Sequence, residues 1–241
     1  MSSIPFLLKY ERRAALAPEE LADLDALLEP PRTVPIHGDL VRQGERPDHS
    51  VVLLSGLAGR NHSFRDGGRQ FSQLHVAGDF VDLHSFLLNT MDHSVTALTE
   101  SQVAHVPHER LKRMTSRSPR LARLLWLDTL IDGAVHRQWI ARMGRLSSVA
   151  NFAHLLCELH ERYGLVDMVR DDGFDLTLTQ ADLADVLGLS AVHVNRIVQE
   201  LRASGAVTWD GRRLTVLDWS RLVGMAEFDP TYLQLELHDI G

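Results

Sequence analysis

The sequence predicts an α+β protein made of an N-terminal β-roll, a long central helix and a C-terminal winged helix-turn-helix. Three patterns predict this class: short apolar segments separated by glycines over residues 33–107, apolar residues at helical spacing over 119–143, and two short helical patterns around a glycine within 176–202. We expect the roll with an N-terminal helix over residues 1–115, the long helix over 116–145 and the C-terminal domain over 146–241.

Residues 1–30 are expected to be helical, because Pro18 and the glutamates that follow it open a helix that Pro30 and Pro31 end. Between Thr33 and about Pro107, alternating apolar residues and regular turn signals are typical of an all-β roll or barrel. The segment 65–69, Arg-Asp-Gly-Gly-Arg, predicts a hairpin turn within this roll.

The stretch Pro119–Met143 predicts a helix of about 25 residues, with Trp126 and Trp139 beside its apolar stripe and Gly144 marking its end. A helix of this length often packs against a second copy of itself, and an ordinary core helix is the alternative. The stripe holds six residues: Leu121, Leu124, Leu127, Ile131, Ala134 and Val135. Residues 147–163 predict the next helix.

The stretch from Leu176 to Arg202 is the most informative part of the chain. Thr179 caps a first short helix, and Asp182 is placed to reach back as a capping-box carboxylate. Gly188 supplies the left-handed residue that ends this helix, and Ser190 caps the second one. A second helix with a polar, arginine-bearing face is the helix-turn-helix design, in which that helix enters the DNA major groove; a helical hairpin inside a core is the alternative.

Residues 205–216 predict a β-hairpin, the wing, with Asp210 and Gly211 at its tip. The tail that follows is expected to form a short helix around Trp219 and then to fold back as a structural cover. Contact of the tail with DNA or polymerase is left open.

Composition narrows the classes of protein. No apolar run approaches the roughly 18 residues of a membrane span, and the N-terminus lacks a secretory leader pattern, so a cytoplasmic protein without a membrane partner is expected. Cys157 is the one cysteine and lies in an apolar run, which excludes an internal disulfide. The net charge of −7 argues against a protein that coats nucleic acid, so DNA contacts should be few and placed.

The order of roll, long helix and winged helix-turn-helix resembles the Crp/Fnr family of bacterial transcription regulators over nearly the whole chain. The motifs that carry the resemblance are Gly38-Asp39, Gly44-Glu45, LLSGLAGR at 53–60, AGDFVDL at 77–83, LTESQVAHVPHERL at 98–111 and TQADLADVLGLSAVHVNRIVQELR at 179–202. The resemblance implies a cyclic-nucleotide-binding-like jelly roll, a homodimer joined by the long helix, a palindromic double-stranded DNA operator and contact with RNA polymerase.

On this resemblance, Arg196 matches the base-reading arginine, which holds a guanine edge with two hydrogen bonds, and Ser190 would meet a backbone phosphate. Ala191 and Val192 stand where the best-known members have arginine and glutamate, so the operator should differ, with Val192 meeting a thymine methyl. The residues expected at DNA are Thr179, Gln180, Ser190, Val192, His193, Asn195, Arg196 and Arg202.

In cyclic-nucleotide-binding members, a glutamate and an arginine after the Gly-Asp-Phe turn hold the ribose and the phosphate. Leu83 and His93 stand at these positions, so cyclic AMP is disfavoured, and the single cysteine excludes the iron–sulfur cluster of the oxygen-sensing branch. A remodelled effector pocket would be lined by Asp82, Leu83, His84, Asp92, His93, Ser94 and His136, with exposed turns as the alternative.

The chain holds thirteen histidines, and haem or metal sensing is one interpretation because imidazole is a common ligand of both. The roll holds no tight His-x-His or His-x-x-x-His pair, so we expect scattered or hydrogen-bonded histidines, no metal site and no resident cofactor. Haem or another small effector remains an open alternative.

A transcription regulator, and not an enzyme, is the expected function. A cupin-type metal enzyme would need a compact ligand set that the spacing does not supply, and no acyl-transfer or nucleotide-hydrolysis motif occurs. A sensor that acts through protein contacts alone is the third alternative.

Overall fold

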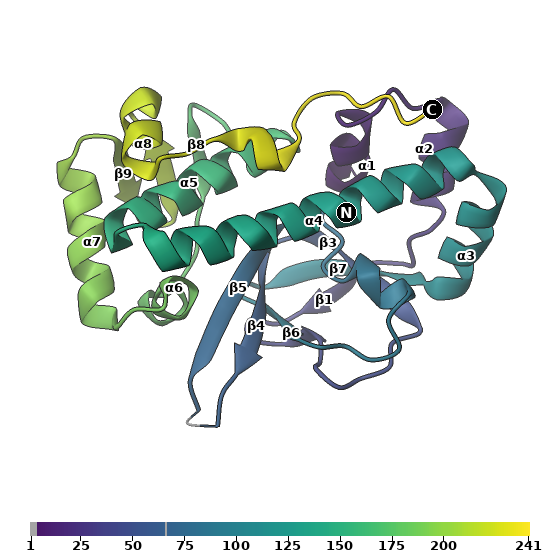
Figure 1. Ribbon diagram of the computed structural model, residues 1–241, viewed down its shortest axis with the longest axis horizontal. Helices are drawn as coiled ribbons and strands as arrows, with labels where there is room; N and C mark the ends of the chain where they lie inside the picture. The colour runs from purple at the N-terminus through teal and green to yellow at the C-terminus, as the bar shows by residue number, and fades with distance from the viewer. Residues whose placement is uncertain (1–3, 66) are drawn as a thin grey trace.

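The computed structural model describes residues 4–65 and 67–241 and confirms the predicted α+β class (Figure 1). A β-roll lies against one long helix, α4, and a mostly helical C-terminal domain sits at one end of that helix. The chain opens with helices α1 (Ile4–Glu11) and α2 (Pro18–Asp25), as expected, while residues 1–3 of the predicted helical segment lie outside the described residues. Pro18 stands in the first turn of α2, where a missing N–H costs nothing.

The roll consists of two antiparallel sheets. One has the order β1 (Arg32–Val34), β7 (Ser101–Pro107) and β3 (His49–Ser55), and the other β2 (Asp39–Val41), β6 (Ser94–Ala97), β4 (Leu57–Ser63) and β5 (Arg69–Val76). Strands β4 and β5 form the expected hairpin with Ser63 opposite Arg69; Asp66 of its turn lies outside the described residues. Valines and small apolar residues fill the space between the sheets: Val51, Leu53, Ala58, Val81, Val95 and Val103.

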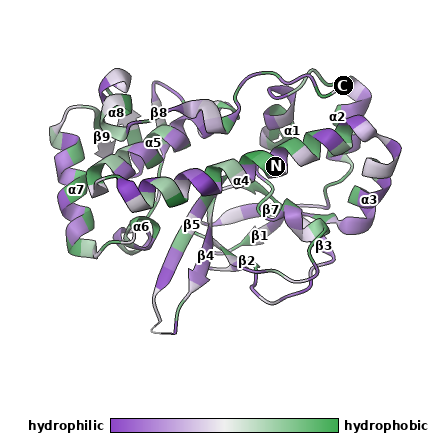
Figure 2. Ribbon diagram, viewed as in Figure 1, coloured by the Kyte–Doolittle hydropathy of each residue, from purple (hydrophilic) through white to green (hydrophobic). Residues whose placement is uncertain are grey.

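Helix α3 (His108–Arg117) leads into α4 (Pro119–Arg145), which Ser118 caps by accepting a hydrogen bond from the Leu121 N–H. The helix runs one residue past Gly144, where the sequence pattern placed its end. Hydrophobic and hydrophilic bands alternate along α4 (Figure 2), as an amphipathic helix requires. Trp139 is fully buried, whereas Trp126 is 66% exposed, so the two tryptophans lie on opposite faces.

Helix α5 (Ser148–Gly164) is almost entirely buried, including Cys157. The helix-turn-helix follows as α6 (Gln180–Leu187) and α7 (Ala191–Ala203), and the wing as β9 (Val207–Asp210) and β10 (Arg213–Val216). A third strand, β8 (Gly173–Asp175), pairs with β10 and was not anticipated from the sequence. Three residues are too few to show an alternating pattern, and the preceding Asp171 and Asp172 both have positive φ, which marks a turn.

The tail forms helix α8 (Trp219–Ala226) and a 3₁₀ turn, η2 (Pro230–Leu233), then runs back towards α1 and α2 (Figure 1). Arg13 donates to the carbonyls of Leu233 and Gln234, and Arg123 to those of Ile240 and Gly241. The tail is thus a structural cover, as expected. No helix in the described part of the chain has the length and apolar character of a membrane span.

Candidate DNA interface and sensor pocket

The geometry of the helix-turn-helix follows from its caps. The Thr179 hydroxyl accepts from the Asp182 N–H at 3.0 Å, and Gly188 ends α6 with φ +66°, a conformation that glycine adopts at little cost. Ser190 then accepts from the His193 N–H at 3.4 Å and starts α7. Asp182 does not act as the expected capping-box acid: its carboxylate accepts from the Thr179 hydroxyl at 2.6 Å.

The outer face of α7 is polar and exposed near its N-terminus. Val192 is 82% exposed, and Asn195 and Arg196 are exposed beside it. The Arg196 guanidinium donates to the His193 Nε2 at 2.9 Å, which holds it along the helix surface. Gln180 and Asn195 exchange two hydrogen bonds, of 2.8 and 3.1 Å, and so join the start of α6 to α7.

A surface groove between α6, α7 and the wing gathers four of the residues expected at DNA: Thr179, Gln180, Asn195 and Arg202. Arg202 lies at the far end of α7 and donates to the Trp209 carbonyl, so it anchors the wing and does not join Arg196. The other four lie at the start of α7: Ser190 caps it, and Val192, His193 and Arg196 are on its first two turns.

Arg60 on β4 links the roll to α4. It is 6% exposed, bonds to Asp132 of α4 at 3.0 Å and donates to the Gln73 Oε1 at 3.1 Å. Burial would raise the pKa of Asp132, but the charge of Arg60 outweighs it and lowers that pKa. The sequence analysis did not single out these residues, although a charged side chain within an apolar strand is the signal that could have found Arg60.

Three of the residues assigned to the effector pocket come together beside this pair. One ligating atom each of His84, Asp92 and His93 lies within 4.8 Å of the other two. The His93 Nδ1 is 2.7 Å from the Asp92 Oδ1, and the imidazole centroids of His84 and His93 are 5.1 Å apart. Burial, Arg60 and His84 lower the pKa of His93 to about 4, so this ring is neutral at pH 7.

His136 and His62 border the same cluster. The pKa of His136 on α4 is lowered by burial first and then by Arg60, and His62 and Asp92 also act on it. The His62 ring on β4 lies 6.4 Å from that of His93. Scattered histidines were expected, and the fold instead gathers these from β4, the loops around β6 and α4.

The remaining assigned residues, Asp82, Leu83 and Ser94, make contacts of other kinds. Asp82 accepts from the Val51 N–H at 2.6 Å, and burial raises its pKa to about 7. Leu83 packs in the apolar cluster with Phe80 and has no acceptor to offer a ribose. Ser94 accepts from the Gln43 N–H at 3.0 Å. These contacts give each side chain a structural role.

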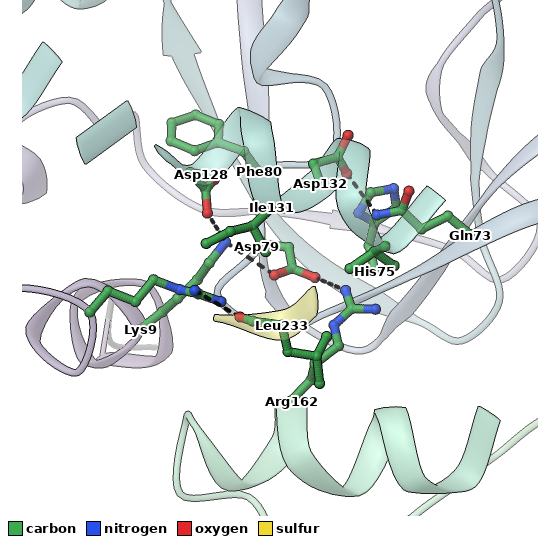
Figure 3. Close-up of a pocket in the computed structure, with 12 residues that line it drawn as sticks. Lys9, Gln73, His75, Asp79, Phe80, Asp128, Ile131, Asp132, Arg162 and Leu233 are labelled. Atoms are coloured by element: carbon green, nitrogen blue, oxygen red, sulfur yellow. Dashed lines mark hydrogen bonds and ion pairs between the residues drawn. The ribbon is translucent and has the colours of Figure 1, made fainter. Parts of the chain in front are cut away.

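A second polar cluster, which sequence analysis missed, is buried between the roll, α1, α4 and α5 (Figure 3). Lys9 lies 2.7 Å from Asp128 and 3.2 Å from Asp79, which in turn is 2.6 Å from Arg162. The cavity among them has a volume of about 30 Å³, enough for a water molecule or two and far too small for a nucleotide. Lys9, Asp128 and Arg162 are on helices. From sequence alone, a charged residue on a helix is expected to face solvent, which is why this cluster was missed.

Comparison with known proteins gives two domain matches. Residues 31–118 match the cyclic nucleotide-binding domain, and residues 152–225 match the Crp-like helix-turn-helix domain. Transcriptional activator protein FnrL of Cereibacter sphaeroides is 28% identical over 88% of the chain and 86% of that protein. Transcriptional activator protein anr of Pseudomonas aeruginosa is 24% identical over 88% of the chain and 86% of that protein.

Among solved structures, FixK2 from Bradyrhizobium japonicum has a TM-score of 0.73 and 20% identity, covering 81% of this chain and 96% of that one. The c-di-GMP responsive global regulator CLP of Xanthomonas campestris has a TM-score of 0.60 and 18% identity, covering 83% and 99%. These structures share the order of roll, long helix and helix-turn-helix domain.

Proposed function

Because the chain belongs to the Crp/Fnr family of DNA-binding transcription regulators, we propose that it acts as a homodimer on a palindromic operator. Its relatives are transcription regulators, and the cupin-type enzyme considered from the sequence is not favoured. A bacterial regulator of this kind works in the cytoplasm and meets RNA polymerase at the promoter, and we extend both expectations to this chain.

The observation that carries the proposal is the exposed, polar first half of α7. In a helix-turn-helix this part of the second helix points at base edges. Among the described residues, His193 holds Arg196 along that surface with one hydrogen bond, which a guanine edge would replace with two. The Ser190 hydroxyl would meet a phosphate, and the exposed Val192 a thymine methyl.

An apolar stripe on α4 supports the dimer. Trp126, Leu130 and Ile140 are 66%, 53% and 58% exposed, and their spacing places them along one face of the helix. Large apolar side chains aligned on an exposed helix are typical of an interface. Two copies of α4 packed in parallel along this stripe would place the two α7 helices at the same end of the dimer, because the C-terminal domain lies at one end of α4 (Figure 1).

Selection of bound sequences from a random DNA pool tests the DNA interface. We expect enrichment of a palindrome with half-sites about one helical turn apart. Arg196→Ala should weaken binding to the selected site by about 10- to 100-fold, since a bidentate arginine–guanine contact contributes about 1–3 kcal/mol. The matched control is Arg113→Ala on α3, which removes one exposed positive charge at the opposite end of the molecule (Figure 1). Equal affinity for both variants would contradict the assignment.

Light scattering tests the dimer. Leu130→Glu buries a charge in the proposed interface, so we expect the mass of a monomer at micromolar concentrations, with an unchanged circular dichroism spectrum. Ser116→Glu, at an exposed site on α3, should leave the mass of a dimer. A Leu130→Glu variant that stays dimeric would show that α4 is not the interface.

A further inference from the structure

We propose that His84, Asp92 and His93 form a binding site for one divalent transition-metal ion, and that this ion is an effector of the roll. The site itself stands on the geometry of the cluster. Its role as an effector site rests on the proposed function.

The two imidazoles are spaced as ligands of one ion. Two histidines bound tetrahedrally, with metal–nitrogen bonds of about 2.0–2.1 Å, place their ring centroids roughly 5 Å apart. The centroids of His84 and His93 are 5.1 Å apart. Asp92 is exposed, and its Oδ1 lies 2.7 Å from the His93 Nδ1, so its carboxylate supports the second imidazole on the side away from Nε2.

The hydrogen bonding of the cluster leaves the right atoms free. The His93 Nδ1 donates to Asp92, which fixes the ring and leaves the lone pair of Nε2 available, as at metal-ligating histidines supported by a carboxylate. The Nε2 atoms of His84 and His93 are buried, and neither finds a hydrogen-bond partner among residues 4–65 and 67–241. Buried polar atoms are normally paired, so an occupant is expected here.

Charge favours a cation over an anion. Arg60 is neutralised by its ion pair with Asp132, and the buried Nε2 atoms of His84 and His93 have no hydrogen-bond partner among the described residues. Asp92 then leaves one negative charge. An anionic phosphate would be repelled, while imidazole and carboxylate ligands suit Zn²⁺, Ni²⁺, Cu²⁺ or Fe²⁺ better than Mg²⁺ or Ca²⁺.

The position of the site also explains how ion binding would affect the rest of the molecule. His136 faces the cluster from α4, and its Nδ1 is buried without a partner among the described residues. Water molecules and His136 would supply the remaining ligands. An ion held between the roll and α4 would bias the position of the helix that carries the proposed dimer stripe.

Metal binding by the full-length, chelator-treated protein tests the site without DNA. We expect one Zn²⁺ per chain by competition with a chromophoric chelator, and a visible d–d spectrum when Co²⁺ replaces it. His93→Ala and His84→Ala should each weaken Zn²⁺ binding at least tenfold. Asp92→Asn, at an exposed position that keeps the fold, should weaken it by about 10-fold. Mg²⁺ should not compete.

The matched control is His105→Ala. The His105 ring stacks on that of His49, with centroids 4.0 Å apart, next to Asp48, so the control removes a histidine from another close pair of the roll. Its loss should leave Zn²⁺ affinity and the Co²⁺ spectrum unchanged. Stoichiometric binding that survives the His84, Asp92 and His93 changes, or no binding at all, would overturn the site.

A second measurement separates the site from its role. Zn²⁺ should change the affinity of the wild-type protein for its selected DNA at least fivefold, and that of Asp92→Asn much less. Zn²⁺ binding without any change in DNA affinity would overturn the effector role and leave the site standing. Failure to bind DNA under all conditions would instead contradict the proposed function.

Discussion

The buried carboxyl of Asp82 makes a structural hydrogen bond, and its ionisation lowers the stability of the folded state. Its Oδ1 accepts from the Val51 N–H at 2.6 Å, which ties the turn after β5 to strand β3. Its Oδ2 is buried and finds no partner among the described residues. Burial therefore raises the pKa of Asp82 to about 7, well above its value in an unfolded chain.

This pKa predicts that Asp82→Asn increases the free energy of unfolding, and that the increase depends on pH. The folded state favours the neutral acid, so the stability that Asp82 contributes is complete below about pH 4 and is lost as the pH rises towards 7. The amide keeps an acceptor for Val51 and cannot ionise. We expect the variant to be more stable than wild type by about 1–3 kcal/mol at pH 8 and nearly equal at pH 3.5. Urea unfolding at both values measures this, and an equal difference at both would contradict it.

The positions of individual residues were predictable where a short sequence pattern, such as a helix cap, determines them. Arg196, Ser190 and Gly188 follow from the cap and face of a helix, and the structure places them accordingly. His84 and His93 are nine residues apart, which is no local motif, and only the path of the chain around β6 brings them together. Long-range proximity of this kind has no signature in a single sequence.

At the scale of elements, the β4–β5 hairpin is bound to the DNA-binding unit. Arg69 lies 3.4 Å from Asp182 and 3.0 Å from Asp185 of α6, and Gln70 donates to the Asp185 carbonyl at 3.0 Å. Asp182 is 1% exposed, and Arg69 is the permanently charged partner beside it, with the His37 Nδ1 3.9 Å away. The roll thus holds the first helix of the helix-turn-helix directly, and the connection does not run through α4 alone.

Arg69→Ala should release α6 from the hairpin. Removing the arginine leaves a buried carboxylate short of its partner, so α6 should open more often. We expect amide hydrogen exchange of residues 182–187 to be about fivefold faster, the equivalent of about 1 kcal/mol. Arg65→Ala, at an exposed position in the same hairpin, should leave the exchange of α6 unchanged. Similar exchange in both variants would show that the contact does not hold α6.

The helices and strands were largely predictable because the residue patterns that mark them in the sequence are strong. The helices, the wing and the hairpins of the roll carry caps, glycine turns or alternating apolar residues, and each is present. Strand β8 has no such signal, and its identity comes from pairing with β10, in which Phe174 lies opposite Leu214. The contact of Arg69 with α6 was also beyond prediction, because it joins residues 113 positions apart.

At the scale of the whole molecule, the buried charges centred on Asp79 connect five segments. Asp79 meets Lys9 of α1 and Arg162 of α5, and Arg162 meets Glu158, which accepts from Tyr232 of the tail and Trp139 of α4. Burial would raise the pKa of Asp79, but Arg162 and Lys9 outweigh it and hold that pKa well below its usual range.

Asp79→Asn should destabilise the whole protein. The stability from a carboxyl with a depressed pKa is present above about pH 4 and is lost in acid, so we expect a loss of about 3 kcal/mol at pH 7 that shrinks below pH 4. Asp23→Asn, which removes an exposed ion pair with Arg117, should cost under about 1 kcal/mol. Thermal unfolding across this pH range compares the two, and equal losses would contradict the role of the cluster.

The single cysteine has a practical consequence for measuring how far the roll lies from α7 in solution. Cys157 is fully buried in α5, and burial together with Glu161 raises the pKa of its thiol, so it stays protonated and inaccessible. Thiol-reactive dyes should therefore leave the folded wild-type chain unlabelled. Cysteines introduced by Arg65→Cys and Gln199→Cys, at exposed sites on the hairpin and on α7, would then carry a fluorescent pair that reports the distance between roll and recognition helix in solution.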